Sequence, residues 1–157
     1  ILQTVLYGDN AIGNGNCVAT AMASILEIPL WMMPPWESMF ARPDWHARRT
    51  QWLNRMFGLD YVVMWPSKKK LGQYVNSNWE DDSGLVYMDA KDLPEFYIAC
   101  GPTERGSHHA VVYSHGAQVH DPHYSGAGLI SVDRVEFFRK CPEGTIEGNS
   151  IPSSAYV

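Results

Sequence analysis

The chain has 157 residues and a mass of 17.7 kDa, a length that suits one domain with one core. Apolar residues make up 45% of it and charged residues 18%, which is typical of a folded protein and excludes a disordered one. The formal net charge is −5, and the basic residues are scattered apart from residues 68–70. Nucleic acids bind broad basic surfaces, so we expect a single domain over residues 1–157 that does not bind nucleic acid.

No apolar run approaches the ~20 residues that cross a bilayer, and the first residues lack the pattern of a signal peptide. We therefore expect no membrane association. The three cysteines, Cys17, Cys100 and Cys141, form no CxxC pair, which argues against a disulfide framework or a zinc site. At least one thiol is then free, as in a reducing compartment, and we expect a cytoplasmic protein without a metal or cofactor.

The N-terminal half carries the helical patterns. After a partly β-branched segment at residues 3–7, residues 8–16 are rich in Gly and Asn and predict a loop. Residues 17–26 are apolar nearly all round and precede a proline, which predicts a buried helix with Asn16 near its N-cap.

Next along the chain, residues 31–43 are aromatic and Pro-rich, and we expect a surface loop with one helical turn. Apolar residues then recur at helical spacing between Asp44, an N-cap residue type, and Gly58, a common C-terminal stop. This spacing predicts a second helix.

The C-terminal half carries short β-type runs between Gly and Pro turns. Residues 61–65 predict a strand, and residues 67–75 predict a short exposed helix. Five further strands are expected at residues 85–88, 96–100, 110–113, 118–120 and 129–132. Helices first and strands second indicate an α+β fold, with the helices packed on one side of an antiparallel sheet.

Cys17 is the first candidate functional residue. It follows Gly13-Asn14-Gly15-Asn16 and begins the first predicted helix. The first turn of a helix offers free N–H groups and a positive dipole end, which favour a thiolate. The preceding glycines allow close approach of the backbone to a substrate. A small buried cysteine in a core would give the same pattern.

His109 and Asp121 form the second candidate feature. Residues 108–113 and 117–121 flank a Ser-His-Gly turn and read as a hairpin. The start of one strand then lies beside the end of the next, so we expect His109 and Asp121 to be neighbours. A carboxylate there would orient the imidazole as a base for a thiol.

Three motifs together resemble the papain-like cysteine peptidase superfamily. They are Gly15-Asn16-Cys17 before an Ala-rich helix, the strand His109-Ala110-Val111-Val112, and the strand end His120-Asp121-Pro122. The likeness is strongest to compact prokaryotic members, such as the bacteriocin-leader peptidase domains of export transporters, and to small papain-like proteins of bacteria and phages. It spans roughly residues 3–129. It implies a papain-like fold with Cys17 as nucleophile, His109 as general base and Asp121 as the orienting residue.

The resemblance also implies a glutamine upstream of the cysteine that completes the oxyanion hole. The upstream glutamine of this chain is Gln3, which lies farther from Cys17 than the usual short spacing. Either the loop is an insertion and Gln3 still serves, or an amide of Asn10, Asn14 or Asn16 takes its place. We favour Gln3.

Several alternatives stay open. His108 competes with His109 as the base, and strand alternation favours His109. The histidines and Asp121 together contain zinc-ligand types, but without a helical HExxH spacing. Arg105 either recognises an anionic group or is a solvated loop residue, and four tryptophans either line a groove or fill the core. These are Trp31, Trp36, Trp45 and Trp52.

The sequence thus predicts a cysteine-dependent peptidase or amidase that cleaves an amide or isopeptide bond of a peptide or protein substrate through a thioester. Acyl transfer is not separated from hydrolysis. The alternative is a non-catalytic papain-like binding protein, such as a phage-encoded modulator of a host protein, which would act in the host cytoplasm. The sequence does not fix the oligomeric state.

Overall fold

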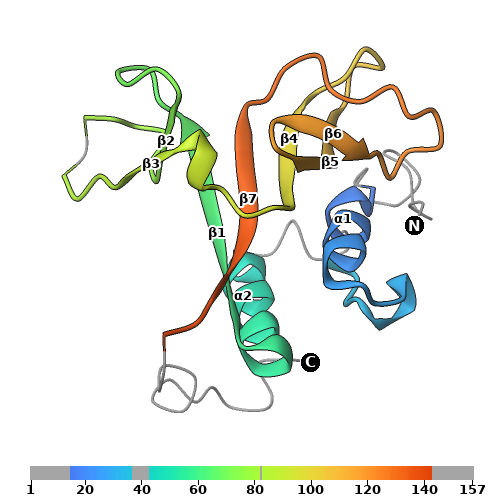
Figure 1. Cartoon of the computed structure of the whole chain (residues 1–157). Helices are drawn as coiled ribbons and strands as arrows, with labels where there is room; N and C mark the ends of the chain where they lie inside the picture. Colours follow the sequence, from blue (N-terminus) through green and yellow to red (C-terminus); the bar gives the residue numbers. More distant parts are fainter. Residues whose placement is uncertain (1–14, 37–42, 82, 143–157) are drawn as a thin grey trace.

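The computed structural model describes residues 15–36, 43–81 and 83–142. Within these ranges two α-helices pack on a seven-stranded antiparallel sheet of order β3-β2-β1-β7-β4-β5-β6 (Figure 1). The α+β class is therefore confirmed. The strands are β1 (Leu59–Pro66), β2 (Gln73–Val75), β3 (Tyr87–Asp89), β4 (Tyr97–Pro102), β5 (His108–Ser114), β6 (Ala117–His120) and β7 (Arg134–Lys140). Two short 3-10 helices, η1 (Leu30–Met32) and η3 (Ala90–Asp92), join these elements.

Helix α1 (Cys17–Leu26) has the predicted bounds, with Asn16 at its N-cap. Residues 18–23 are buried; five of them are apolar, and the hydroxyl of Thr20 donates a hydrogen bond to the Asn16 carbonyl. The helix ends where Glu27 adopts a left-handed conformation at φ 56° and the N–H of Ile28 bonds to the carbonyl of Ala23. This closing turn satisfies carbonyl groups that the last helical turn leaves open.

Helix α2 (Trp45–Phe57) also has the predicted bounds, between Asp44 and Gly58. Gly58 has a φ of 67°, a conformation that glycine adopts without strain. The carboxylate of Asp44 accepts a hydrogen bond from Arg48 Nε at 2.7 Å and makes no side-chain cap. The predicted N-cap position is confirmed, while its side chain forms an ion pair one turn along the helix.

The two helices share one face of the sheet. Helix α1 lies against β4 and β5, and α2 lies against β1 (Figure 1). Their buried side chains meet in one core with Ile98, Cys100 and Val112 from the sheet. The opposite face carries a second cluster built around Tyr97, Val135 and Phe137. The helix face is the one on which a site between α1 and α2 can form.

The short helix predicted at residues 67–75 is wrong. Residues 73–75 form β2, which pairs with both β1 and β3. The preceding lysines form a turn because the Ser67 hydroxyl accepts hydrogen bonds from the N–H groups of Lys69 and Lys70. Gly72, at φ 79°, then redirects the chain into the strand. Local side-chain bonding of this kind competes with helix formation.

The strand predicted at residues 129–132 is also wrong, and the sequence prediction missed β7. The segment runs beside β4 with two isolated backbone bonds, from Ile130 N–H to Pro102 O and from Asp133 N–H to Cys100 O. It passes so close that a Cβ on Gly101 would collide with the Ser131 carbonyl oxygen. The ladder itself begins one residue later, at Arg134, where β7 enters between β1 and β4.

The shared core predicts a clear difference between two positions on α2. Leu53 is fully buried, whereas Met56 on the same helix is 56% exposed. Replacing a buried leucine with alanine removes its transfer free energy and leaves a cavity. We expect Leu53→Ala to lower the free energy of unfolding by about 2–5 kcal/mol in urea titrations. Met56→Ala, the matched control, should change it by less than about 0.5 kcal/mol, and equal losses would contradict this packing.

Candidate active site

A pocket of about 860 Å³ opens between the two helices over the centre of the sheet. Helix α1 contributes Cys17 and Val18, and α2 contributes Trp45, His46 and Arg49. Its remaining lining comes from the loop before α1 and from the sheet and its loops: Gly15, Val63, Trp65, Cys100, Arg105, Ser107, His108, His109, Ala110, His123, Arg134 and Glu136. The pocket therefore contains both the predicted nucleophile and the predicted base.

The structure brings His109 and Asp121 together. His109 Nε2 and Asp121 Oδ1 lie 2.6 Å apart, and both side chains are almost completely buried. The β5–β6 hairpin makes this contact because residues 115 and 116 take left-handed conformations and return the chain beside β5. The Asp121 carboxylate also accepts hydrogen bonds from the N–H groups of His123 and Gly128, both at 2.8 Å. The carboxylate, itself held by these two N–H groups, fixes the imidazole ring through its Nε2 atom.

Cys17 lines the same pocket as His109. It is the first residue of α1, and the backbone N–H of Ala110, the residue that follows His109, acts on its thiol and favours the thiolate. The N–H of Val18 also favours the thiolate. The thiol and the imidazole thus face one pocket from two different elements, α1 and β5.

Burial sets the protonation of both groups. It raises the pKa of Cys17, although the N–H groups of Ala110 and Val18 oppose the shift. The helix start does favour the thiolate, as the sequence suggests, but desolvation outweighs these backbone dipoles and the pKa is raised overall. Burial also lowers the pKa of His109, against the opposing effect of Asp121. At neutral pH the two groups form a neutral thiol and a neutral imidazole.

The pKa of Asp121 shifts in the opposite direction from that of a simply buried acid. Burial alone would raise it, but the hydrogen bonds from His109, His123 and Gly128 together leave it below its ordinary value. Asp121 is therefore a carboxylate at neutral pH. A carboxylate that receives several hydrogen bonds is the state that can hold an imidazole in one orientation.

Three of the four candidates for the oxyanion hole lie outside the residues that the structure describes. Gln3, Asn10 and Asn14 all fall within residues 1–14, which are not among the described residues. Asn16 is described and is 5% exposed. The choice between Gln3 and the asparagines therefore stays a prediction.

The other histidines have different surroundings. His108 is exposed and bonds through Nε2 to Asp133 Oδ2 at 3.0 Å, so it is directed away from Asp121. His123 Nδ1 bonds to Ser125 Oγ at 2.8 Å, and His115 lies in the hairpin turn. Among the described residues, no three His, Cys, Asp or Glu side chains gather in a way that could hold a metal ion. No helix in the same ranges is long and apolar enough to cross a membrane.

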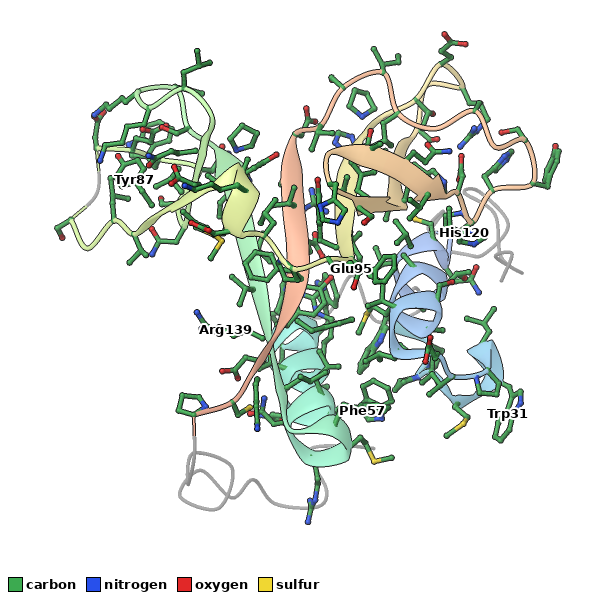
Figure 2. The ribbon with its side chains drawn as sticks, viewed as in Figure 1. Trp31, Phe57, Tyr87, Glu95, His120 and Arg139 are labelled. Atoms are coloured by element: carbon green, nitrogen blue, oxygen red, sulfur yellow. The ribbon has the colours of Figure 1, made fainter. Side chains whose placement is uncertain are left out.

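The tryptophans divide between core and surface. Trp36 and Trp52 pack edge to face in the core, with ring centroids 6.1 Å apart, and Trp45 lines the pocket. Trp31 on η1 is 82% exposed and points away from the molecule (Figure 2). Of the four residues predicted for either a groove or the core, only Trp45 belongs to this pocket.

The sequence prediction missed a charged cluster at the pocket wall. Glu136 on the central strand β7 is flanked by Arg49 from α2 and Arg134 from β7, and it accepts a hydrogen bond from the Tyr61 hydroxyl. A signal was present, because residues 134–137 alternate between charged and apolar side chains, the period of a strand. The sequence prediction missed this strand because its charged residue Glu136 is buried, whereas charged side chains are usually exposed.

Comparisons of the chain with protein-family models, with curated proteins and with solved structures found no match. The papain-like resemblance therefore rests on the three sequence motifs.

The pKa of Cys17 gives a test in the intact protein. Because burial disfavours the thiolate, we expect alkylation of Cys17 by iodoacetamide to rise with pH around a midpoint above that of the same residue in urea. Mass spectrometry of the labelled peptide measures the rate at each pH. A folded-state midpoint below the denatured value would show a thiolate already formed at rest and would contradict the neutral pair.

The Asp121 carboxylate gives a second test, because its lowered pKa links it to stability. A depressed acid contributes stability that is complete above its unfolded value of about 3.8 and is lost as the pH falls through the lower folded pKa. We expect Asp121→Asn to reduce the free energy of unfolding at neutral pH by about 1–3 kcal/mol. The difference from wild type in urea titrations should shrink below pH 3.8, and a pH-independent difference would contradict this account.

Proposed function

We propose that this protein is a papain-like thiol hydrolase that cleaves an amide or isopeptide bond through a thioester on Cys17. One observation carries the proposal. A cysteine at a helix start and a buried, hydrogen-bonded His109–Asp121 pair line the same pocket, with the cysteine sulfur beside the residue that follows the histidine. Nucleophile, base and orienting carboxylate in this relation are the recurring parts of a catalytic triad.

The roles of the two ring nitrogens of His109 follow from the hydrogen bond that one of them already makes. Asp121 holds His109 Nε2, so Nδ1 is the ring nitrogen that exchanges protons with the thiol. As Cys17 Sγ attacks the substrate carbonyl carbon, its proton passes to Nδ1. Asp121 stabilises the resulting imidazolium. When the C–N bond breaks, the departing nitrogen takes that proton and the acyl group remains on sulfur as a thioester.

Water completes the reaction. A water molecule attacks the thioester carbonyl and gives a proton to His109 Nδ1, and the C–S bond then breaks. The acid product leaves, and the proton returns to the Cys17 sulfur. An amine in place of water would give acyl transfer by the same steps, so the proposal covers both outcomes.

The helix start supplies part of the oxyanion stabilisation. The N–H of Cys17 is one of the free donors at the first turn of α1. A donor of this kind stabilises the negative oxygen that forms when the carbonyl is attacked. Gln3 is the proposed second donor.

A second candidate function is a non-catalytic protein that uses the same pocket for binding. The observation in its favour is that burial raises the pKa of Cys17, which makes the resting thiol a poor nucleophile. The two functions differ in whether His109 activates that thiol.

We expect Cys17 to be acylated by p-nitrophenyl acetate, with release of p-nitrophenol and a thioester on Cys17 that mass spectrometry detects after acid quenching. Because the resting thiol is neutral, acylation needs the base, and His109→Gln should slow it by about 10²-fold or more. Cys17→Ser should abolish thioester formation at this site. Asp121→Asn should slow acylation as well, because the carboxylate orients the base.

Two matched variants control for these changes. His115→Asn removes a histidine from the turn of the same hairpin and suits the φ of 51° there. Cys141→Ser removes a thiol that does not line the pocket. Both should acylate Cys17 at the wild-type rate. Acylation that is equally fast in His109→Gln would contradict the hydrolase and favour the binding protein.

A further inference from the structure

A short chain of neighbouring residues connects Cys17 with the charged cluster at the pocket wall. Cys17 is next to Ala110, and Ala110 is the cross-strand partner of Cys100. The Cys100 thiol lies 3.5 Å from Glu136 Oε2, on the helix face of the sheet. Three side chains of this cluster line the pocket, namely Arg49, Arg134 and Glu136, and we call them the charged floor.

The charged floor has more positive than negative charge. Glu136 is 4% exposed at its side chain, and its nearest cations are Arg134 Nε at 2.6 Å and Arg49 Nη1 at 3.6 Å. The two arginines lower the pKa of Glu136, against the effect of burial, so it is ionised. Two guanidinium groups against one carboxylate leave one excess positive charge, shared between the buried Arg49 and the partly exposed Arg134. A cation that is partly removed from water and lacks its own counterion favours an anion beside it.

No neighbour on α2 supplies that anion. Arg49 Nη2 lies 3.3 Å from His46 Nδ1, and arginine can only donate, so this histidine nitrogen must accept and is unprotonated. The Arg49 guanidinium otherwise stacks on the rings of Tyr61 at 3.4 Å and Trp45 at 4.6 Å. These contacts hold the cation in place without neutralising it.

Arg134 has the geometry to receive a ligand. Its side chain is 35% exposed, and its Nε is the atom bonded to Glu136. Among the described residues no hydrogen bond is recorded from its two terminal nitrogens. Terminal guanidinium nitrogens bind carboxylates in a two-point arrangement. The pocket is therefore cationic at its floor in a protein whose net charge is −5.

We propose that the charged floor is an anion subsite, and that the pocket selects amides or peptides carrying a carboxylate that binds Arg134 in the same pocket as Cys17. This inference rests on the proposed function for its substrate class, while the subsite itself does not depend on turnover. A monoanionic carboxylate matches the single excess charge of the floor. The reaction would then act on acidic substrates in preference to their neutral analogues.

Two alkylating reagents that differ in charge test the subsite at Cys17 itself. Iodoacetate is an anion and iodoacetamide is neutral, and both react with the same thiolate, so their rate ratio cancels the thiolate fraction. We expect the ratio of iodoacetate to iodoacetamide at Cys17 to be about threefold higher in the folded protein than in urea. A ratio equal to or below the denatured value would overturn the proposal.

Three variants assign the effect to the floor. Arg134→Gln should remove most of the threefold preference, and Arg134→Lys should retain much of it because the charge is kept. The matched control is Arg139→Gln, an arginine on the same strand that is exposed and points away from both helices (Figure 2). It should leave the ratio unchanged, and an equal loss in both glutamine variants would show a general charge effect and overturn the subsite.

A binding measurement separates the subsite from the proposed reaction. In Cys17→Ser, the fluorescence of the pocket residues Trp45 and Trp65 should respond to N-acetylglycine but not to neutral N-acetylglycinamide, and Arg134→Gln should remove the response. If this binding is found while Cys17 resists p-nitrophenyl acetate, the subsite stands and the hydrolase falls. If acylation depends on His109 but neither the rate ratio nor the binding depends on Arg134, the hydrolase stands and the subsite is overturned.

Discussion

The buried carboxylate of Glu136 is the constraint on which the arrangement of the site depends. It lies on the central strand β7, and its neighbours come from three elements: Arg49 on α2, Tyr61 on β1 and Cys100 on β4. An ionised acid in this position must be surrounded by donors and cations. Meeting that requirement holds α2 over β1 and β7 on the same face as α1, and the space left between the two helices is the pocket.

The same burial decides how the thiol can work. A dry pocket raises the pKa of Cys17 and lowers that of His109, so a preformed thiolate–imidazolium pair is not the resting state. In the proposed reaction, charge separation would then occur only as the thiol attacks, when Asp121 and the backbone donors would stabilise the charges that develop. A resting site of this kind protects the sulfur from adventitious alkylation and oxidation, because the thiolate is the reactive form.

Local patterns predicted the helices and the hairpin well. Caps and stops at Asn16, Asp44 and Gly58 fixed both helices, and the turn between β5 and β6 placed His109 beside Asp121. The failures involve interactions between distant residues. Nothing near Glu136 in the sequence shows that Arg49 will lie beside it, and the residues of β7 were assigned no element from the sequence. The raised pKa of Cys17 could not be predicted for the same reason, since burial comes from the whole fold and not from the first turn of a helix.

A glycine, which has no side chain, also shapes the site. Gly101 is the cross-strand partner of His109, and the backbone at Ser131 crosses where its side chain would be. That crossing segment leads through Asp133 directly into β7 and its charged residues. Any larger residue at position 101 would push this segment away from β4 and disturb His109 and the charged floor of the pocket together. The shape of the pocket therefore depends on a glycine that does not line it.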